Sequence, residues 1–166
     1  MRRLIWPVLF LLLILVQGAA SAFYTGWLSC DLAVLGLYAF AMLRGERHGA
    51  LVGFGIGFVQ DALTVGVFGY HMLTRIALGY CVGLMKEKVV KDNATFHVAT
   101  IAVLSAGLRF AYWWLELIRS GGRWGIFFEY LSASIGYILG NMLLVVPVVL
   151  LCKRVYQWIR EKDISY

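Results

Sequence analysis

Long stretches without a charged side chain are the feature that most limits what this chain can fold into. The first runs from Leu4 to Cys30, and similar apolar runs follow as far as Leu151, separated by short polar segments. A membrane-spanning helix needs about 20 mostly apolar residues, so the 166 residues allow five or six spans. Only 14% of them are charged, against roughly a quarter in soluble domains. We therefore expect an all-α integral membrane protein with a single membrane domain over residues 1–166.

The apolar runs predict about six transmembrane helices and a short tail. We place the helices at 4–23, 27–43, 49–65, 69–85, 94–118 and 125–151, and the tail at 152–166. The start of the chain imitates a signal peptide, with two arginines before the apolar run and a small-residue triplet at 20–22. An uncleaved first helix is favoured, because the uncharged run is longer than a signal core. The two middle spans are short and rich in glycine, and a re-entrant pair is the alternative there.

Basic residues predict the orientation. The N-terminus, the polar loops at 44–48 and 86–93, and the tail hold eleven of the 15 Lys and Arg residues. The opposite side holds only Arg119 and Arg123. Because Lys and Arg concentrate in cytoplasmic loops, both termini are expected in the cytoplasm.

Asp61 and Arg75 are the clearest charged residues inside predicted spans. They lie equally far from Phe68, the expected centre of the turn, so an antiparallel hairpin would place them at the same depth. An unpaired charge near the bilayer centre costs at least about 2.5–3.5 kcal/mol, which favours an ion pair between them. We interpret this pair as a folding contact, with a proton or ion relay as the alternative.

Glycines recur every four residues beside these two charges. They are Gly49, Gly53, Gly57, Gly79 and Gly83. Small residues at this spacing let helix backbones approach closely. We therefore predict a close-packed hairpin whose glycines and charges share one face.

A second group of charges is expected near the outer ends of the last two spans. Arg109 and Glu116 lie seven residues apart and so share a helix face, and Glu129 is level with Glu116 across the loop at 119–124. We interpret the group as a local charge network, with the rim of a binding surface as the alternative. Asp31 is expected to be solvated or to snorkel at the outer end of its span.

Several function classes find no support in the sequence. The net charge of +6 lies in short clusters between apolar runs, which argues against nucleic-acid binding. The three cysteines and three histidines lack metal-ligand spacing, and no Ser or Cys has a base at an evident spacing. We expect no catalytic residue, no metal and no cofactor.

The segment from Gly53 to Gly83 resembles the central hairpin of the rod shape-determining MreD family. That family's pattern is a Gly-rich helix ending in a Gln/Asp pair, a Gly-containing turn, and a Leu-rich helix with a Gly-Tyr step. Here the pattern falls on Gly53, Gly57, Gln60, Asp61, Gly66, Gly69, Leu73, Gly79, Tyr80 and Gly83. Chain length and basic loops are similar too, whereas His71 and Arg75 stand where many members carry small or apolar residues.

The resemblance implies a non-enzymatic subunit of the bacterial elongation (rod) machinery in the inner, cytoplasmic membrane. Such a subunit would bind the single-span protein MreC and help link MreB filaments to the enzymes that synthesise side-wall peptidoglycan. The resemblance also implies a bundle similar to the S-components of energy-coupling-factor transporters. We hypothesise that an MreC-like helix docks on the faces that carry the glycines.

The main alternative function is the substrate-binding S-component of an energy-coupling-factor vitamin transporter. Such a subunit needs an outward-facing polar pocket, and the candidate is the cluster of Glu116, Arg119, Arg123 and Glu129. An ion or solute channel is a third interpretation, but no polar stripe is long enough to line a pore.

Overall fold

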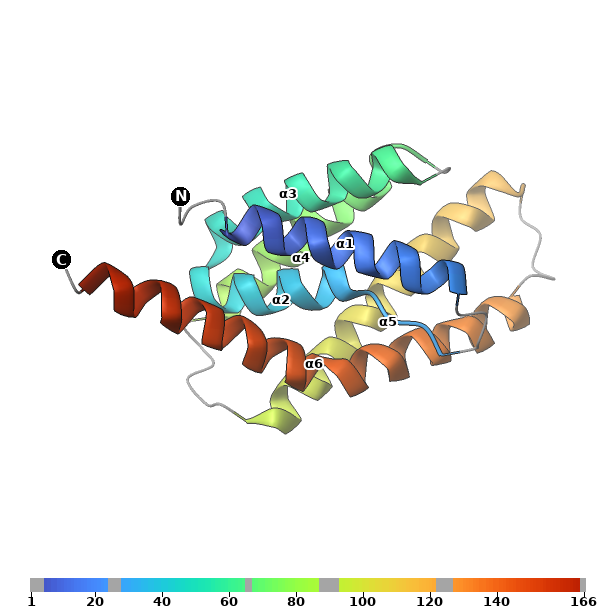
Figure 1. Ribbon diagram of the computed structural model, residues 1–166. Coiled ribbons are helices and arrows are strands. Elements are labelled where there is room, and N and C mark those ends of the chain that lie inside the picture. The colour runs from blue at the N-terminus through green and yellow to red at the C-terminus, as the bar shows by residue number, and fades with distance from the viewer. Residues whose placement is uncertain (1–4, 24–27, 65–66, 87–92, 122–126, 165–166) are drawn as a thin grey trace.

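The computed structural model describes residues 5–23, 28–64, 67–86, 93–121 and 127–164, apart from the side chains of 20–23, 129 and 161–164. The described residues form six α-helices and no strand, in agreement with the predicted all-α class. The helices are α1 (Ile5–Phe23), α2 (Leu32–Arg44), α3 (Glu46–Leu63), α4 (Tyr70–Met85), α5 (Ala94–Arg119) and α6 (Phe127–Ile164). Figure 1 shows that α1 begins and α6 ends at the same end of the bundle.

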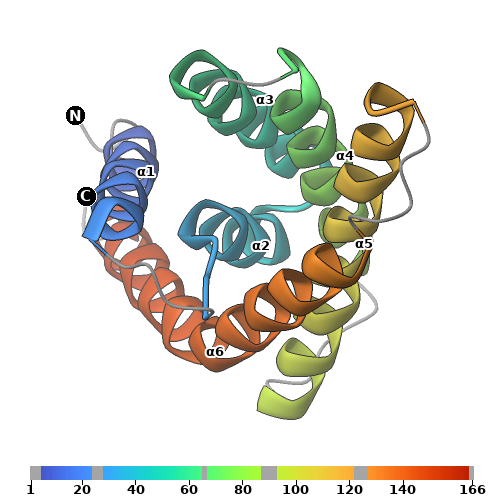
Figure 2. The same ribbon diagram turned by 90° about the vertical axis from the view of Figure 1, so that its right-hand side faces the viewer.

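The shortest helix forms the centre of the bundle. α2 has 13 residues, which is a length of about 20 Å, and it contacts α1, α3, α4 and α6. Its residues from Ala33 to Ala41 are buried, and the other helices surround it when the bundle is viewed end-on (Figure 2). α2 therefore supplies the core of the bundle, and the surrounding helices supply its outer surface.

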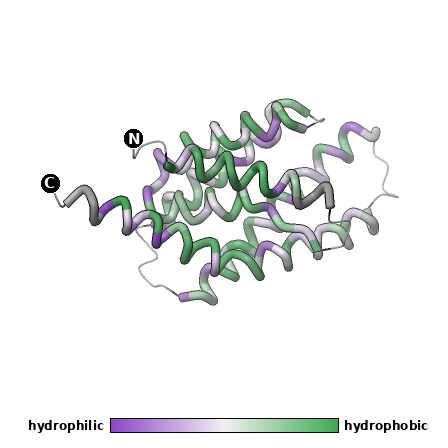
Figure 3. The backbone as a smooth tube through the Cα atoms, viewed as in Figure 1, coloured by the Kyte–Doolittle hydropathy of each residue, from purple (hydrophilic) through white to green (hydrophobic). Residues whose placement is uncertain are grey.

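The outer surface is strongly apolar. Hydrophobic residues run along most of each helix (Figure 3), and the side chains of Leu51, Leu73, Val103 and Leu143 are each more than two-thirds exposed. Soluble monomers rarely expose large apolar patches, so this surface is suited to lipid. Among the described helices, α5 and α6 are each long and apolar enough to cross a membrane, while the apolar helices α1 and α2 are shorter.

Two predicted boundaries near α2 need correction. The polar loop expected at 44–48 is reduced to Gly45, whose φ of +91° is readily adopted only by glycine, and α3 begins directly at Glu46. The span expected from residue 27 becomes helical only at Leu32, because Asp31 caps the helix by accepting a hydrogen bond from the N–H of Val34. The turn expected near residues 24–26 falls largely outside the described residues.

The expected tail is also different, because α6 continues through Pro147 to Ile164. Cys152 and Ile159 in this extension are buried against the bundle, so an apolar face stabilises the helix beyond the predicted end of the span. The loop residues 87–92 and 122–126 lie outside the described part of the chain.

Candidate functional site: a polar network inside the bundle

The glycines of α3 and α4 lie directly against the opposite helix. A Cβ atom built on Gly49, Gly53 or Gly57 would come closer than 3.0 Å to the backbone of α4, and one on Gly79 or Gly83 would meet the backbone of α3 in the same way. Only glycine allows two helix backbones to approach so closely. The two glycine stripes therefore face each other within this chain.

This packing corrects the hypothesis that a partner helix docks on the glycine faces, because α3 and α4 already cover each other's glycines. Gly69 differs from the other predicted interface glycines. It adopts a φ of +97° at the start of α4, and a Cβ atom there would have open space around it. Its role in the structure is to form the turn.

Asp61 caps the first turn of α4. Its carboxylate accepts hydrogen bonds from the backbone N–H groups of Gly69 (2.9 Å), His71 (3.0 Å) and Met72 (3.0 Å). The Nδ1 atom of His71 lies 2.9 Å from the same carboxylate. The first N–H groups of a helix lack partners within the helix and carry its positive dipole end, so they compensate this buried negative charge.

The predicted ion pair between Asp61 and Arg75 is therefore replaced. The glycine contacts place Arg75 level with Gly53, and Met72 level with Gly57. These contacts centre the hairpin several residues before Phe68. Arg75 consequently lies about two helical turns deeper along α3 than Asp61.

Arg75 forms its ion pair with Asp31. The Nη2 atom of Arg75 donates to Oδ2 of Asp31 at 2.5 Å, and its Nε donates to Oε1 of Gln60 at 3.0 Å. The side chains of Arg75 and Asp31 are 5% and 8% exposed. Asp31 is therefore buried and paired, which corrects the prediction that it is solvated or snorkelling.

Residues of α5 and α6 extend this pair into a network. Asn141 accepts a hydrogen bond from the backbone N–H of Asp31 (2.8 Å) through Oδ1 and donates to Oγ of Ser105 (2.9 Å) through Nδ2. The hydroxyl of Tyr137 donates to Oδ2 of Asp31 at 3.3 Å. Buried polar groups that are fully hydrogen-bonded rigidify a bundle. We call Asp31, Gln60, Arg75, Ser105, Tyr137 and Asn141 the central network, and it joins α2 through α6.

Among the described residues, the predicted outer charges Arg109 and Glu116 have separate partners. The guanidinium of Arg109 lies 4.3 Å from the ring centroid of Tyr130, and its Nε donates to Oγ of Ser134 at 3.1 Å. Glu116 instead pairs with Arg119 at 3.6 Å on the exposed surface. Arg123 and the side chain of Glu129 lie outside the described part of the chain.

A second buried polar contact was not anticipated from the sequence. The hydroxyl of Tyr38 on α2 lies 2.8 Å from Nδ1 of His97 in the first turns of α5, and both residues are buried. The span predicted at 94–118 includes His97, but nothing in the sequence pairs that residue with Tyr38. The apolar repeat that follows His97 is the sequence feature that places this histidine on a face of α5.

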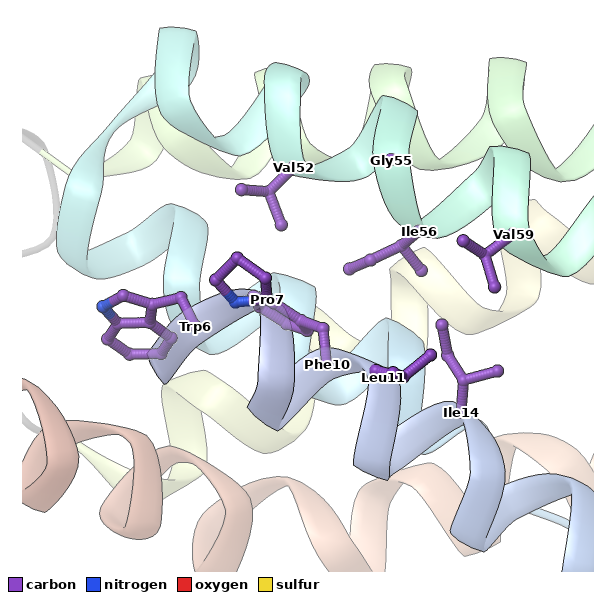
Figure 4. Close-up of a pocket in the computed structure, with 9 residues that line it drawn as sticks. All are labelled: Trp6, Pro7, Phe10, Leu11, Ile14, Val52, Gly55, Ile56 and Val59. Atoms are coloured by element: carbon purple, nitrogen blue, oxygen red, sulfur yellow. The ribbon is translucent and has the colours of Figure 1, made fainter. Parts of the chain in front are cut away.

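Several cavities border the bundle away from the central network. One, of about 370 Å³, is a groove between α1 and α3 lined by apolar side chains (Figure 4). Another, of about 290 Å³, lies between the start of α4 and the end of α5, beside His71 and Arg119. No group of three metal-ligating side chains occurs among the described residues.

Comparison with known proteins identifies a protein family. The family model described as rod shape-determining protein MreD matches residues 1–155 of the 166-residue chain. No curated protein and no solved structure matches the chain.

Proposed function

Since this chain belongs to the rod shape-determining protein MreD family, we propose that it is a non-enzymatic scaffold of the bacterial rod complex. In this role it binds an MreC-like single-span protein. Through that protein it connects MreB filaments to the synthases of side-wall peptidoglycan. The observation that carries the proposal is the family match over residues 1–155, because it covers all six described helices except the end of α6.

We further propose that the chain crosses the inner membrane several times with both termini in the cytoplasm. The apolar outer surface supports this placement. Basic residues at the junction of α2 and α3 (44–47) and in the last turns of α6 (153–160) support it as well. α2 is embedded in the bundle and needs no lipid contact, since its middle residues are buried by the other helices.

The central network supports a scaffold more than a transporter. It joins five helices through buried hydrogen bonds, and a rigid bundle presents fixed outer faces to its partners. A partner helix needs an exposed apolar face. Each of the helices α3, α4, α5 and α6 has one, and its exposed apolar side chains include Leu51, Leu73, Val103 and Leu143, respectively. We propose that the MreC-like helix docks on one of these faces and not on the closed glycine stripes.

Two experiments test this role. Depletion of the protein from a rod-shaped bacterium that relies on it should produce round cells, and re-expression should restore rods. A photo-crosslinking amino acid at each of positions 51, 73, 103 and 143 should capture the MreC-like protein from one face and not from the others. Rod shape that persists after depletion, or capture from none of the four faces, would argue against the proposal. Lost vitamin uptake with normal cell shape would favour the transporter alternative.

A further inference from the structure

We propose that a cavity between the start of α5 and the second half of α6 binds one anionic phospholipid. The phosphate group of the lipid contacts Lys153 and Arg154, and the upper part of an acyl chain lies against the apolar residues that precede them on α6. The inference rests on the membrane placement proposed above, and it does not depend on the identity of any protein partner.

The cavity lies between two helices that are joined elsewhere. A hydrogen bond connects Asn141 of α6 to Ser105 of α5, whereas the residues of α5 that line the cavity are Ala94 and His97 in its first turns. The imidazole of His97 contacts the hydroxyl of Tyr38 on α2, which fixes one wall of the cavity. The space between this wall and α6 has a volume of about 340 Å³, which is within the range of small-ligand sites.

One face of α6 forms the other wall, and its character changes along the helix. The residues of α6 that line the cavity are Val146, Val149, Leu150, Lys153, Arg154 and Gln157. Steps of three and four residues keep them on the same face. The first three are apolar and the last three are polar, over a length of about 17 Å. The cavity thus combines an apolar end with a basic end, as a molecule with an acyl chain and an anionic headgroup requires.

The order of the two ends agrees with the depth of the bilayer. In the proposed orientation α6 runs toward the cytoplasm, so its apolar residues lie within the inner leaflet and Lys153 and Arg154 lie at the cytoplasmic surface. Anionic lipids attract basic residues at this level, and basic pockets between transmembrane helices on the cytoplasmic side bind anionic headgroups. A soluble anion would use only the basic end, whereas a phospholipid uses both.

The basic end of the cavity is accessible to a headgroup. Arg154 and Gln157 are exposed, and Lys153 is partly exposed. None of the described residues that line the cavity is acidic, so a phosphate group there meets positive charge and no carboxylate of the cavity wall. A transmembrane partner helix carries few charges, whereas a phospholipid brings a negative charge and an acyl chain in the required order.

The test compares two lipids with identical acyl chains on the purified full-length chain. The protein is washed free of lipid in mild detergent and titrated with dioleoyl phosphatidylglycerol, which is anionic, or with dioleoyl phosphatidylcholine, which has no net charge. Bound lipid is counted by native mass spectrometry. The first phosphatidylglycerol molecule should bind at least about tenfold more tightly than the first phosphatidylcholine molecule.

Two charge variants locate the site. Arg154→Gln and Lys153→Gln should each weaken phosphatidylglycerol binding about fivefold, and the double variant should weaken it about twenty- to thirtyfold. Arg47→Gln is the matched control. Arg47 is an exposed arginine on the same predicted side of the membrane, in the first turn of α3, but it does not line this cavity. Its replacement should change the affinity less than about twofold.

A bulky variant tests the cavity without a change of charge. Ala94→Trp places an indole in the cavity and should weaken phosphatidylglycerol binding at least about tenfold. Ala111→Trp is its control, because Ala111 is an exposed alanine farther along α5 that does not line this cavity, and it should bind as the original chain does. Circular dichroism checks the helix content of each variant. The charge variants alter only exposed or partly exposed side chains and decide the question if Ala94→Trp misfolds.

Equal affinity for the two lipids would overturn the inference, and so would phosphatidylglycerol binding that is unchanged in the double variant or equally weakened by Arg47→Gln. Displacement of the lipid by inorganic phosphate would overturn it in favour of a soluble anion. Photo-crosslinking from position 150 in cells that captures a protein in place of lipid would overturn it in favour of a docking surface. The lipid titration does not involve cell shape, so its failure leaves the proposed scaffold role to be judged by depletion. Equally, rod shape that persists after depletion leaves the lipid site to be judged by titration.

Discussion

The ion pair between Asp31 and Arg75 provides the sharpest test of the polar network. Asp31→Asn removes the negative charge but keeps the side-chain volume. Asparagine also caps helices well, so the contact with the N–H of Val34 can persist. The variant therefore isolates the loss of the counter-charge from the loss of the helix cap.

The burial of both side chains determines how much free energy of unfolding each substitution costs. Both side chains are less than a tenth exposed, and removal of one partner from a buried ion pair costs about 3–5 kcal/mol. Asp31→Asn and Arg75→Gln should each lower the free energy of unfolding by that amount. The double variant leaves two neutral side chains and should cost less than the sum, with a coupling energy of at least about 2 kcal/mol.

The double-mutant cycle can be measured by unfolding the purified chain in mixed micelles with increasing SDS, followed by circular dichroism. The control cycle uses Glu116→Gln and Arg119→Gln. That pair is 40% and 52% exposed, and it should show a coupling energy of about 0–1 kcal/mol. A cost below about 1 kcal/mol for Asp31→Asn, or additivity of the buried pair within about 0.5 kcal/mol, would show that the ion pair does not stabilise the bundle as proposed.

Three further predictions concern single sites. Gly53→Ala should destabilise the chain by about 1–3 kcal/mol, because the new methyl group would meet the backbone of Arg75, while Gly107→Ala, with open space around it, should be neutral or slightly stabilising by thermal melting in detergent. Asp61→Ala should remove the cap of α4 and lower stability by about 1–2 kcal/mol, seen as faster hydrogen exchange confined to the start of that helix. Tyr38→Phe should remove the hydroxyl contact to Nδ1 of His97 at a cost of about 0.5–1.5 kcal/mol, and an unchanged melting temperature would contradict this.

The sequence was sufficient to place most of the helices. The spans predicted at 69–85 and 94–118 agree with Tyr70–Met85 and Ala94–Arg119, because charged or glycine-containing segments separate the apolar runs. Glycines at four-residue spacing pointed to the close approach of two helices, since no side chain can be accommodated there. These features depend on local pattern, which a single sequence carries.

The pairing of the buried charges depended on information that local pattern lacks. Asp61 and Arg75 are close in sequence, and an assumed turn centred on Phe68 made them appear level. α3 ends at Leu63. The Asp61 carboxylate accepts hydrogen bonds from backbone N–H groups at the start of α4. An acidic residue shortly before a glycine and a new helix was a usable sign of such a cap. The partner of Arg75 lies 44 residues away, and only the packing of α2 inside the bundle brings it near.

The glycine contacts and the central network are parts of one arrangement. Gly53 lies against the backbone of Arg75, so the register of the α3–α4 hairpin fixes the depth of the guanidinium. That depth matches the N-terminal end of α2, where Asp31 is held by Val34, Tyr137 and Asn141. A slip of the hairpin by one turn would move Arg75 by about 5 Å and leave both charges buried without partners. The ion pair therefore disfavours alternative registers of the hairpin, which is a contribution to specificity that the coupling energy of the pair measures directly.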